Sequence, residues 1–459
     1  MTKKPTKPAF GTPQRRVLMR GRSIDEPHRA ATQLELLFDL TFVVAVAGLV
    51  AQFGHAVGAG HAVSALAPFL QVFFAVWWAW MNFTWFASAY DTDDVRYRLL
   101  TLTQMAGVLL LAAGIPSAFC RRDYLVITVG YLVMRSASAA QWLRAAREDA
   151  AGRATALRYA WWVAVLELLW LARQLAAGAD VLRGAAAQWA FGALVVAELA
   201  VPVWAERAGG TTWHPHHIAE RYTLFTIILL GESVLAVSTG IADALADGLR
   251  PMPVLIALSG LVLLFALWWL YESQPSGAAL AARRTRSFLW GYGHYGSFAA
   301  LAALGAGLEV AVRADGHAGS PATGYAVAIP AAVFLLLLWV THAGPASRPR
   351  PEILVTAALS ILLVPLATAA IPDLTVPAVT VVCVAALTAS LRGRASGQAD
   401  GLREAAQFVG IEDPVDTVDV LAVGGTDGEP GDGLPVPADE HRGTTVGLDP
   451  VQGDPGPEV

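Results

Sequence analysis

Charged residues are scarce in this sequence, and that scarcity bears directly on the class of protein. Only 15% of the 459 residues are Asp, Glu, Lys or Arg, against about 25% in a typical soluble domain. Hydrophobic residues make up 55%, and the mean hydropathy is +0.49. A soluble chain of this length would fold into roughly two or three domains with charged surfaces. The composition therefore argues against an ordinary soluble protein and predicts a membrane protein.

Cysteine is nearly absent, which removes several kinds of site from consideration. The two cysteines, Cys120 and Cys383, lie far apart, in or beside apolar segments. A disulfide framework and a C-x-x-C metal motif both need more or closer thiols, so we predict neither. We also expect no resident cofactor. The first apolar block starts late and is long enough to span a membrane, so the sequence predicts no cleavable signal peptide.

Long apolar segments recur along the chain at the length of a spanning helix, which is about 20 residues. The fourth, fifth and last carry the weakest signal, and the last two are also compatible with a re-entrant hairpin. We therefore predict an all-α, polytopic helical membrane bundle over residues 35–392. The roughly twelve candidate spans lie near 36–54, 66–90, 99–119, 124–143, 159–178, 186–205, 218–240, 252–272, 287–312, 324–342, 352–371 and 374–391.

The two ends of the chain carry opposite charge. Residues 1–34 form a basic arm, and residues 393–459 form an acidic segment with few large apolar residues, which predicts a disordered tail. We expect the first 30 residues to be disordered as well. Loop arginines gather on the side of the arm, so the positive-inside rule places both termini in the cytoplasm. Neither end is typical of nucleic-acid binding, and the arm is expected to contact anionic lipid headgroups.

Two features recur in the same order and suggest an internal duplication. Glu35-Leu-Leu-Phe38 opens one span and Glu220-Arg-Tyr-Thr-Leu-Phe225 opens another, and each following span carries a tryptophan pair. Two six-span repeats, 35–205 and 218–391, would be related as in known transporters. Tryptophans at span ends are also expected as interfacial belts, so both interpretations stay open.

Ionisable side chains inside spans are the natural functional candidates. Each costs about 2.5–3.5 kcal/mol on insertion scales, and such groups usually face a bundle interior or a water-filled path. The candidates are Asp39, Arg135, Glu167, Glu198, Glu232, His294, Glu309 and His342.

Glu232 and Arg221 lie on one face of the same predicted helix. At 1.5 Å per residue they are about 16 Å apart, which is too far for them to pair. Each therefore needs a partner elsewhere. Glu232 is either an ion or proton pathway group or a protonated structural tie. Glu35 and Asp39 also share a face, and near a helix start they can instead complement the helix dipole.

Two further stretches combine ionisable residues with a structural alternative. His214, His216 and His217 precede a span and, with Glu220, have spacing compatible with a metal site. Because Pro215 interrupts them and no second group of ligands is identifiable, we predict capping and interfacial roles and no metal. In the span from Trp290, His294 and Glu309 could bracket a path, whereas the glycines between them favour close helix packing.

Three blocks of the sequence resemble the signatures of the bacterial low-temperature-requirement A (LtrA) proteins. They are Glu35-Leu-Leu-Phe38-Asp39, Ala219-Glu220-Arg221 with Gly231-Glu232-Ser233, and His294-Tyr295 with Gly307-Leu308-Glu309. The resemblance covers roughly residues 30–390. It implies a multi-pass inner-membrane protein linked by name to growth in the cold, and it does not specify a molecular activity.

A fainter likeness joins the first span to potassium channels with an Arg-x-x-x-Phe-Ser-Asp helix. Asp39-Leu-Thr-Phe42-Val-Val-Ala45 matches part of that motif, but Gln33 stands at the arginine position and Phe38 at the serine. The arginine half recurs as Arg221-Tyr-Thr-Leu-Phe225-Thr226. These departures argue against carrying over potassium selectivity.

Three functions fit these features, and an ion or small-solute permease is our first hypothesis. Second is a non-catalytic membrane sensor or scaffold for cold or stress adaptation, with the acidic tail as its partner-binding segment. Third is a membrane-embedded enzyme or cofactor protein, and we expect no enzymatic activity. The expected partners are the lipid bilayer and an ion or solute, and a homo-oligomer is compatible with the sequence. The predicted pathway residues are Asp39, Glu232, Arg221, Glu220, His294, Glu309 and Glu35.

Overall fold

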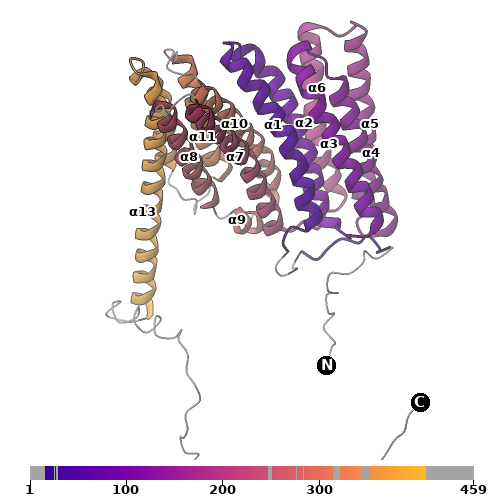
Figure 1. Ribbon diagram of the computed structural model, residues 1–459. Helices are drawn as coiled ribbons and strands as arrows, with labels where there is room; N and C mark the ends of the chain where they lie inside the picture. The colour runs from indigo at the N-terminus through magenta and orange to yellow at the C-terminus, as the bar shows by residue number, and fades with distance from the viewer. Residues whose placement is uncertain are drawn as a thin grey trace, which may run out of the picture. The chain divides into compact units, whose positions relative to one another are not determined.

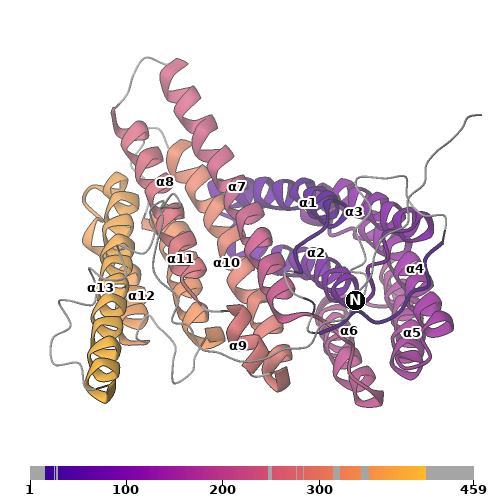
Figure 2. The ribbon, with the colours of Figure 1, turned by 90° about the horizontal axis from the view of Figure 1, so that it is seen from below.

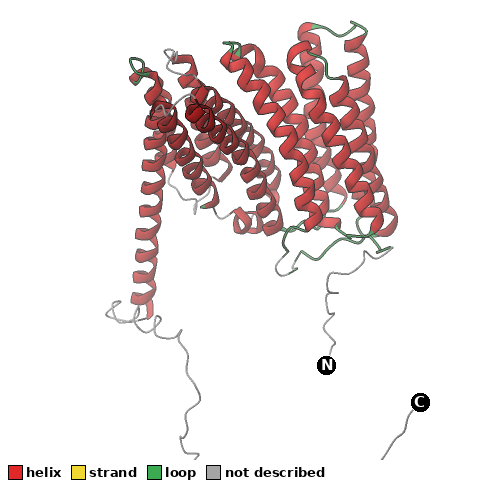
Figure 3. Cartoon of the chain, in the orientation of Figure 1, coloured by secondary structure: helices red, strands yellow, loops and turns green. Residues whose placement is uncertain are grey.

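The computed structural model describes residues 16–24, 26, 29–246, 251–274, 276–282, 284–313, 321–342 and 351–409. These residues are overwhelmingly helical, and none of them forms a strand (Figure 3). The chain divides into a unit of Met1–Gly397 and a second of Gln398–Val459. Every long helix begins in the first unit.

The helices follow one another with short connections (Figure 1). The first half of the chain contains α1 (Gln33–Gly58), α2 (Ala62–Tyr90), α3 (Val95–Arg121), α4 (Leu125–Glu148), α5 (Arg153–Gly178), α6 (Gly184–Ala205) and η1 (Glu206–Ala208). The second half contains α7 (Pro215–Ala246), α8 (Pro251–Glu272), α9 (Ser276–Ala282), η2 (Arg284–Arg286), α10 (Ser287–Arg313), α11 (Pro321–His342), α12 (Pro351–Ala367), η3 (Pro372–Leu374) and α13 (Thr375–Val409).

Ten of the described helices are long and apolar enough to cross a membrane. The predicted all-α polytopic bundle is thus confirmed. Two of the expected spans, α4 and α12, are not among the ten helices that are both long and apolar enough. Helix α4 is long but carries four charged residues, Arg135, Arg144, Arg147 and Glu148. Helix α12 has 17 residues, or about 25 Å, less than a hydrocarbon core of about 30 Å.

Helix α1 contacts helices of both halves, as the view in Figure 2 also indicates. It packs against α2 and α3 on one side and against α7 and α10 on the other. The contact pattern α1–α3–α4–α5 of the first half matches α7–α10–α11–α12 of the second. With the short α9 set aside, this order of neighbours supports the two-repeat hypothesis.

Glycines set the closest helix contacts in both halves. A Cβ on Gly130 of α4 would lie 2.6 Å from the carbonyl oxygen of Gly107 on α3. On α10, a Cβ on Gly307 would meet the backbone of Ala326 on α11. Small residues permit such backbone approach in membranes, as predicted for the glycine-rich span. The two glycine contacts also fall on helix pairs that correspond in the repeat.

The N-terminal arm is partly ordered, contrary to the expectation of disorder for the first 30 residues. The N–H of Val17 donates to Asp94 Oδ2 at 3.0 Å, and the N–H of Met19 donates to Glu148 Oε2 at 2.8 Å. Arg144 donates to the carbonyl of Val17 at 2.6 Å and pairs with Asp94, also at 2.6 Å. Carboxylates at helix ends thus hold the arm backbone, an arrangement that composition does not reveal.

Helix α13 continues to Val409, past residue 393, where the sequence predicts that the acidic segment begins. The acidic residues from 410 onward lie outside the described residues, so the disorder predicted for them stays a prediction.

Candidate functional site

A buried charged cluster joins the starts of α1 and α7. Arg221 of α7 donates to Asp39 Oδ1 of α1 at 2.6 Å, and its Nη1 lies 3.2 Å from Glu35 Oε1. His217 Nε2 lies 3.1 Å from the same Glu35 oxygen. The indole N–H of Trp80 on α2 also donates to Asp39 Oδ1, at 2.7 Å. Both carboxylates of α1 therefore face the arginine of α7.

Local sequence explains how Glu35 and Asp39 reach this position. Thr32 and Glu35 form a capping box, in which the N–H of Thr32 donates to Glu35 Oε2 at 2.6 Å. The next turn of α1 carries Asp39 on the same face. Phe38 stacks on Phe83 of α2 with ring centroids 3.8 Å apart. Capping and aromatic packing together fix the orientation of both carboxylates.

Burial makes the pairing in this cluster obligatory. The side chains of Arg221 and Glu35 are fully buried, and that of Asp39 is 5% exposed. A buried charge without a partner costs several kcal/mol. The second oxygen of Asp39, Oδ2, has no hydrogen-bond partner among the described residues. This oxygen is the one acceptor of Asp39 that remains open to a further ligand.

The N-terminal arm closes the cluster from one side. Arg29 lies 3.5 Å from Glu35 and 3.7 Å from Asp91, in the loop between α2 and α3. The N–H of Ala31 donates to Glu220 Oε2 at 3.3 Å. Glu220, predicted as a pathway residue, is exposed and holds the arm rather than the buried cluster.

Asp91 gives the arm contact a pH dependence. Burial and the nearby Glu35 raise the pKa of Asp91 to about 7, against the opposing effect of Arg29 and Arg22. The ordinary pKa of an unfolded Asp is about 3.9. Below that pH the contribution of Asp91 to stability is fully present, and it is lost as pH rises through the folded-state pKa.

We therefore expect wild-type protein to lose more stability between pH 5 and pH 8 than the variant Asp91→Asn, which mimics the neutral carboxyl. Thermal unfolding in detergent at both pH values measures the difference, at roughly 2–4 °C for each kcal/mol. An equal pH response of the two proteins would contradict the assignment. Asp180→Asn, at an exposed carboxylate, should behave as wild type.

Two further carboxylates lie farther along α7 and near the end of α10. Glu232 of α7 is half-buried and lies within electrostatic range of Glu309 on α10. Glu309 pairs with Arg313 and packs against Gly54 of α1. An open cavity of about 470 Å³ adjoins it, lined by Gly54, His55, Gly58, Ala59, Glu309, Val310, Arg313 and Thr323. We call this cavity the vestibule.

Aromatic and aliphatic side chains separate the vestibule from the charged cluster. Phe42, Phe225 and Phe298, from α1, α7 and α10, are all fully buried. Their ring centroids are 6.5 Å apart for the first pair and 5.2 Å for the second. Asp39 and Gly54 are about 22 Å apart along α1 at 1.5 Å per residue. The two charged regions thus share one helix interface but do not touch.

His294 joins neither group. It is fully buried, its Nδ1 lies 2.7 Å from the carbonyl oxygen of Trp290, and its Nε2 lies 3.2 Å from the hydroxyl of Tyr271. The ring of Tyr222 approaches it edge-on at 4.9 Å. Aromatic neighbours therefore hold His294 on α10, and one of them, Tyr222, directly follows Arg221 on α7.

A separate polar cluster lies within the first half of the bundle. Arg135 of α4 pairs with Glu198 of α6 at 2.8 Å. Two indole groups donate to the same carboxylate, Trp78 at 2.8 Å and Trp170 at 3.2 Å. Glu167 of α5 is buried nearby, and neither of its oxygens has a hydrogen-bond partner in the described part of the chain.

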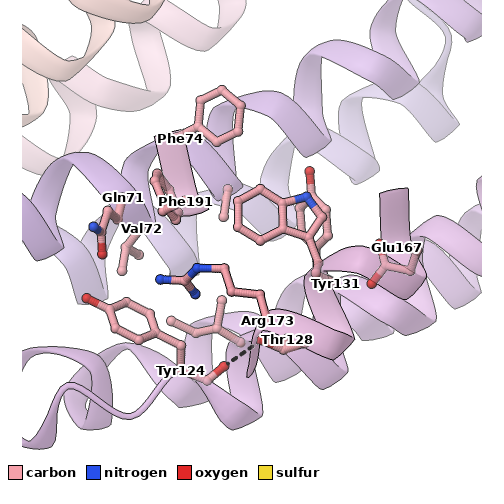
Figure 4. Close-up of a pocket in the computed structure, with 12 residues that line it drawn as sticks. Gln71, Val72, Phe74, Tyr124, Thr128, Tyr131, Glu167, Arg173 and Phe191 are labelled. Carbon is pink, nitrogen blue, oxygen red and sulfur yellow. Dashed lines mark hydrogen bonds between the residues drawn. The ribbon is translucent and has the colours of Figure 1, made fainter. Parts of the chain in front are cut away.

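Next to this cluster, helices α2, α4, α5 and α6 enclose a cavity of about 60 Å³ (Figure 4). We call it the α5 cavity, because α5 supplies both of its charged groups. Glu167 and Arg173 are those groups, and Trp170 lies between them in sequence. The remaining lining residues are Gln71, Val72, Phe74, Ala75, Tyr124, Ile127, Thr128, Tyr131 and Phe191.

The three histidines at the start of α7 include one that caps the helix and one that contacts the charged cluster. The N–H of His217 donates to His214 Nδ1 at 3.3 Å, which caps α7, and the ring of His217 meets Glu35. Burial lowers the pKa of His214, and the charge of His216 adds to this effect. No group of three or more His, Cys, Asp or Glu side chains within the described ranges could hold a metal ion.

The structure thus brings together some of the predicted residues and separates others. Glu35, Asp39 and Arg221 meet, which supplies the partner that Arg221 required. The arginine half of the channel-like motif on α7 and its aspartate half on α1 therefore pair across the interface. Glu232, Glu309 and His294 lie elsewhere. The prediction missed Arg29, Asp91 and Trp80.

Sequence signals for the missed residues were weak. Arg29 belongs to an arm in which many residues are basic, and Asp91 belongs to a loop that carries three acidic residues, Asp91, Asp93 and Asp94. Trp80 lies in a tryptophan-rich stretch that is expected at any membrane interface. Their contacts distinguish them from their neighbours: Arg29 approaches Glu35 and Asp91, and Trp80 donates to Asp39.

The fold and the buried charges define this chain as a multi-pass α-helical membrane protein. The sequence profile described as bacterial low temperature requirement A protein (LtrA) matches residues 30–389. The chain therefore belongs to the LtrA family, and the resemblance noted in its three motif blocks is confirmed.

One curated relative matches part of this chain. An uncharacterized protein of Rhizobium meliloti (strain 1021) is 28% identical over 289 residues. The match covers 57% of this chain and 64% of that protein. The chain thus spans slightly less than two thirds of that relative's length, and the relative supplies no activity to carry over.

Proposed function

We propose that the protein is a permease for a small cation, with its pathway along the interface of α1, α7 and α10. One observation carries the proposal: acidic side chains occupy two levels of this single interface. Glu309 lines the open vestibule, Glu232 lies within electrostatic range of Glu309, and Asp39 lies about 22 Å from Gly54 of the vestibule along α1. Intramembrane carboxylates commonly mark ion pathways.

The three helices run in the same direction, which lets them form a continuous path. Arg221 and Asp39 pair near the starts of α7 and α1. Farther along, a Cβ on Gly305 of α10 would meet Ser233 of α7 and Val50 of α1. The interface therefore extends from the charged cluster to the vestibule without leaving these helices.

The geometry corresponds to a closed pathway. A cation that enters the vestibule meets Glu309 first and then comes within electrostatic range of Glu232. Phe42, Phe225 and Phe298 then block its way, and hydrophobic constrictions of this kind gate pores. Beyond them, Asp39 Oδ2 offers an acceptor, while Arg221 neutralises the other carboxylate oxygen. Opening would require the aromatic side chains to separate.

We also propose a bacterial inner-membrane location with both termini in the cytoplasm. An even number of long helices returns the chain to the side of the arm. The arginine-rich loops of that side fit the cytoplasmic face under the positive-inside rule. Cysteine accessibility at Arg16→Cys against Asp180→Cys, with the native cysteines replaced, would assign the two faces.

Flux in proteoliposomes tests the permease, with potassium, sodium and proton gradients applied separately. We expect Glu232→Gln and Asp39→Asn each to reduce the flux of the transported ion by about tenfold or more, equivalent to about 1.4 kcal/mol. The control is Asp180→Asn, because this exposed carboxylate of the α5–α6 loop pairs only with Arg183 among the described residues.

Two results would contradict the proposal. Wild-type flux in both variants would remove Glu232 and Asp39 from the pathway. The absence of flux from wild-type protein under every gradient would favour the second hypothesis, a membrane sensor or scaffold. Reconstitution of each variant is checked by its recovery in the vesicles, so that lost protein is not mistaken for lost transport.

A further inference from the structure

The α5 cavity is distinct from the proposed pathway, since none of its lining residues belongs to α1, α7 or α10. It holds about 60 Å³, which is room for roughly four to six waters at about 10–15 Å³ each. Two charged side chains of opposite sign line it, and neither is fully paired within the described structure.

Glu167 supplies the negative charge. Its residue is 4% exposed, and both carboxylate oxygens lack hydrogen-bond partners among the described residues. The neighbouring Arg135 pairs through its Nη2 with Glu198 at 2.8 Å, and among the described residues it forms no ion pair with Glu167, although its Nε and Nη1 have no hydrogen-bond partner. Because an unpaired buried carboxylate costs several kcal/mol, Glu167 must either hold a proton or meet a ligand that is positively charged at this point.

Arg173 supplies the positive charge at the other end of the cavity. In Figure 4 its guanidinium extends toward Gln71 and Tyr124, whereas Glu167 lies near Tyr131. Its Nη2 donates to the carbonyl of Ala187 at 3.2 Å, and its Nε has no partner among the described residues. Glu167 and Arg173 are about 9 Å apart along α5 and form no ion pair with each other.

We propose that the α5 cavity binds a small zwitterion whose ammonium group meets Glu167 and whose carboxylate meets Arg173. A ligand with both charges supplies a partner for the buried carboxylate of Glu167, which requires one, and at the same time for the half-buried guanidinium of Arg173. The volume suits a molecule of about five or six non-hydrogen atoms. Trp170 and Tyr131 in the wall add a favourable surface for an ammonium group.

Ligands with a single charge satisfy the cavity less well. A simple cation would neutralise Glu167 but would meet the guanidinium of Arg173. A simple anion would pair with Arg173 but would meet the carboxylate of Glu167. This inference does not depend on the permease proposal, because binding is measured without any flux and involves different residues.

Equilibrium binding of β-alanine to the purified full chain in lipid nanodiscs tests the inference. β-Alanine has the required size and both charges, while ethylammonium and propionate each retain one of them. We expect one β-alanine per chain, and binding of each single-charge analogue that is weaker by at least about tenfold. Glu167→Gln and Arg173→Gln should each weaken β-alanine binding by at least about tenfold.

Further variants separate loss of the site from loss of the fold. Ala75→Leu fills the cavity from its opposite wall and should abolish binding without changing a charge. Asp180→Asn and Arg183→Gln, an exposed pair of the same half, should bind as wild type. Ligand-free Glu167→Gln should unfold at the wild-type temperature or above it, because the variant removes a buried charge that has no described partner.

Three outcomes would overturn the proposal. Wild-type protein that binds no β-alanine would leave Glu167 simply protonated. Equal affinity for ethylammonium, with no effect of Arg173→Gln, would indicate a cation site. β-Alanine binding that survives both Glu167→Gln and Arg173→Gln would place the ligand elsewhere in the protein.

Discussion

Replacing Arg221 with glutamine is expected to lower the free energy of unfolding by about 3–5 kcal/mol, the usual cost of breaking a buried ion pair from one side. Arg221 is fully buried and faces both Asp39 and Glu35. The substitution leaves Asp39 with only the indole of Trp80. Thermal unfolding in detergent micelles measures the loss.

The double variant Asp39→Asn with Arg221→Gln tests whether the loss of stability comes from an unpaired buried charge or from the changed shape of the side chain. It removes one charge of each sign, and Glu35 keeps Arg29 and His217 as neighbours. Stability should therefore recover substantially relative to Arg221→Gln alone, with a coupling energy of about 0.5–3 kcal/mol. The exposed Arg183→Gln is the control and should change stability by about 0.5 kcal/mol or less. An Arg221 effect as small as this control would show that the buried pair is dispensable.

Replacing Gly130 with leucine should be comparably damaging for a steric reason. A Cβ at this position would lie 2.6 Å from the carbonyl oxygen of Gly107 and 3.0 Å from the Cα of Leu111. Backbone atoms cannot rotate away as a side chain can, so α3 and α4 must separate. Overpacking typically costs about 1–3 kcal/mol and occasionally more, and we expect this clash with backbone to lie at the upper end of that range. Resistance to proteolysis and the unfolding temperature would both fall.

Gly192 provides a matched control on α6. A Cβ there would have no heavy atom within 4 Å, so Gly192→Leu adds the same side chain without a clash. It should leave stability unchanged or raise it by about 0.5–1 kcal/mol, because glycine disfavours helices. Similar unfolding temperatures for the two leucine variants would mean that α3 and α4 do not pack as closely as Gly107 and Gly130 indicate.

The helices could be predicted from the sequence, because the length and periodicity of each apolar segment are enough to indicate a helix there. The coupling of Glu35 and Asp39 was equally accessible, since a spacing of four residues places them on one face. The need of Arg221 for a partner also followed from its position inside a span. In each of these cases the prediction depends on residues of a single helix, so the sequence of that helix is sufficient.

The identity of that partner could not be predicted, because Asp39 and Arg221 are 182 residues apart in sequence. Several carboxylates were equally plausible partners until the packing of α1 against α7 was known. The contact of the N-terminal arm with the bundle could not be predicted for the same reason, because the arm backbone binds Asp94 and Glu148, which are far from it in sequence. The sequence identifies Glu167 as an intramembrane charge, but the cavity beside it depends on the packing of four helices, α2, α4, α5 and α6.

The separation of Asp39 from Arg221 also has a consequence for biosynthesis. A ribosome that adds about 5–20 residues per second completes Asp39 roughly 10–40 s before it reaches Arg221, 182 residues later. During that interval Arg29 is the cation of the described flank that lies within ion-pair distance of Glu35. The nascent first helix must therefore wait with its carboxylates protonated, at the aqueous boundary, or within the insertion machinery. Its final position in the bilayer is fixed only after the second half of the protein has been made.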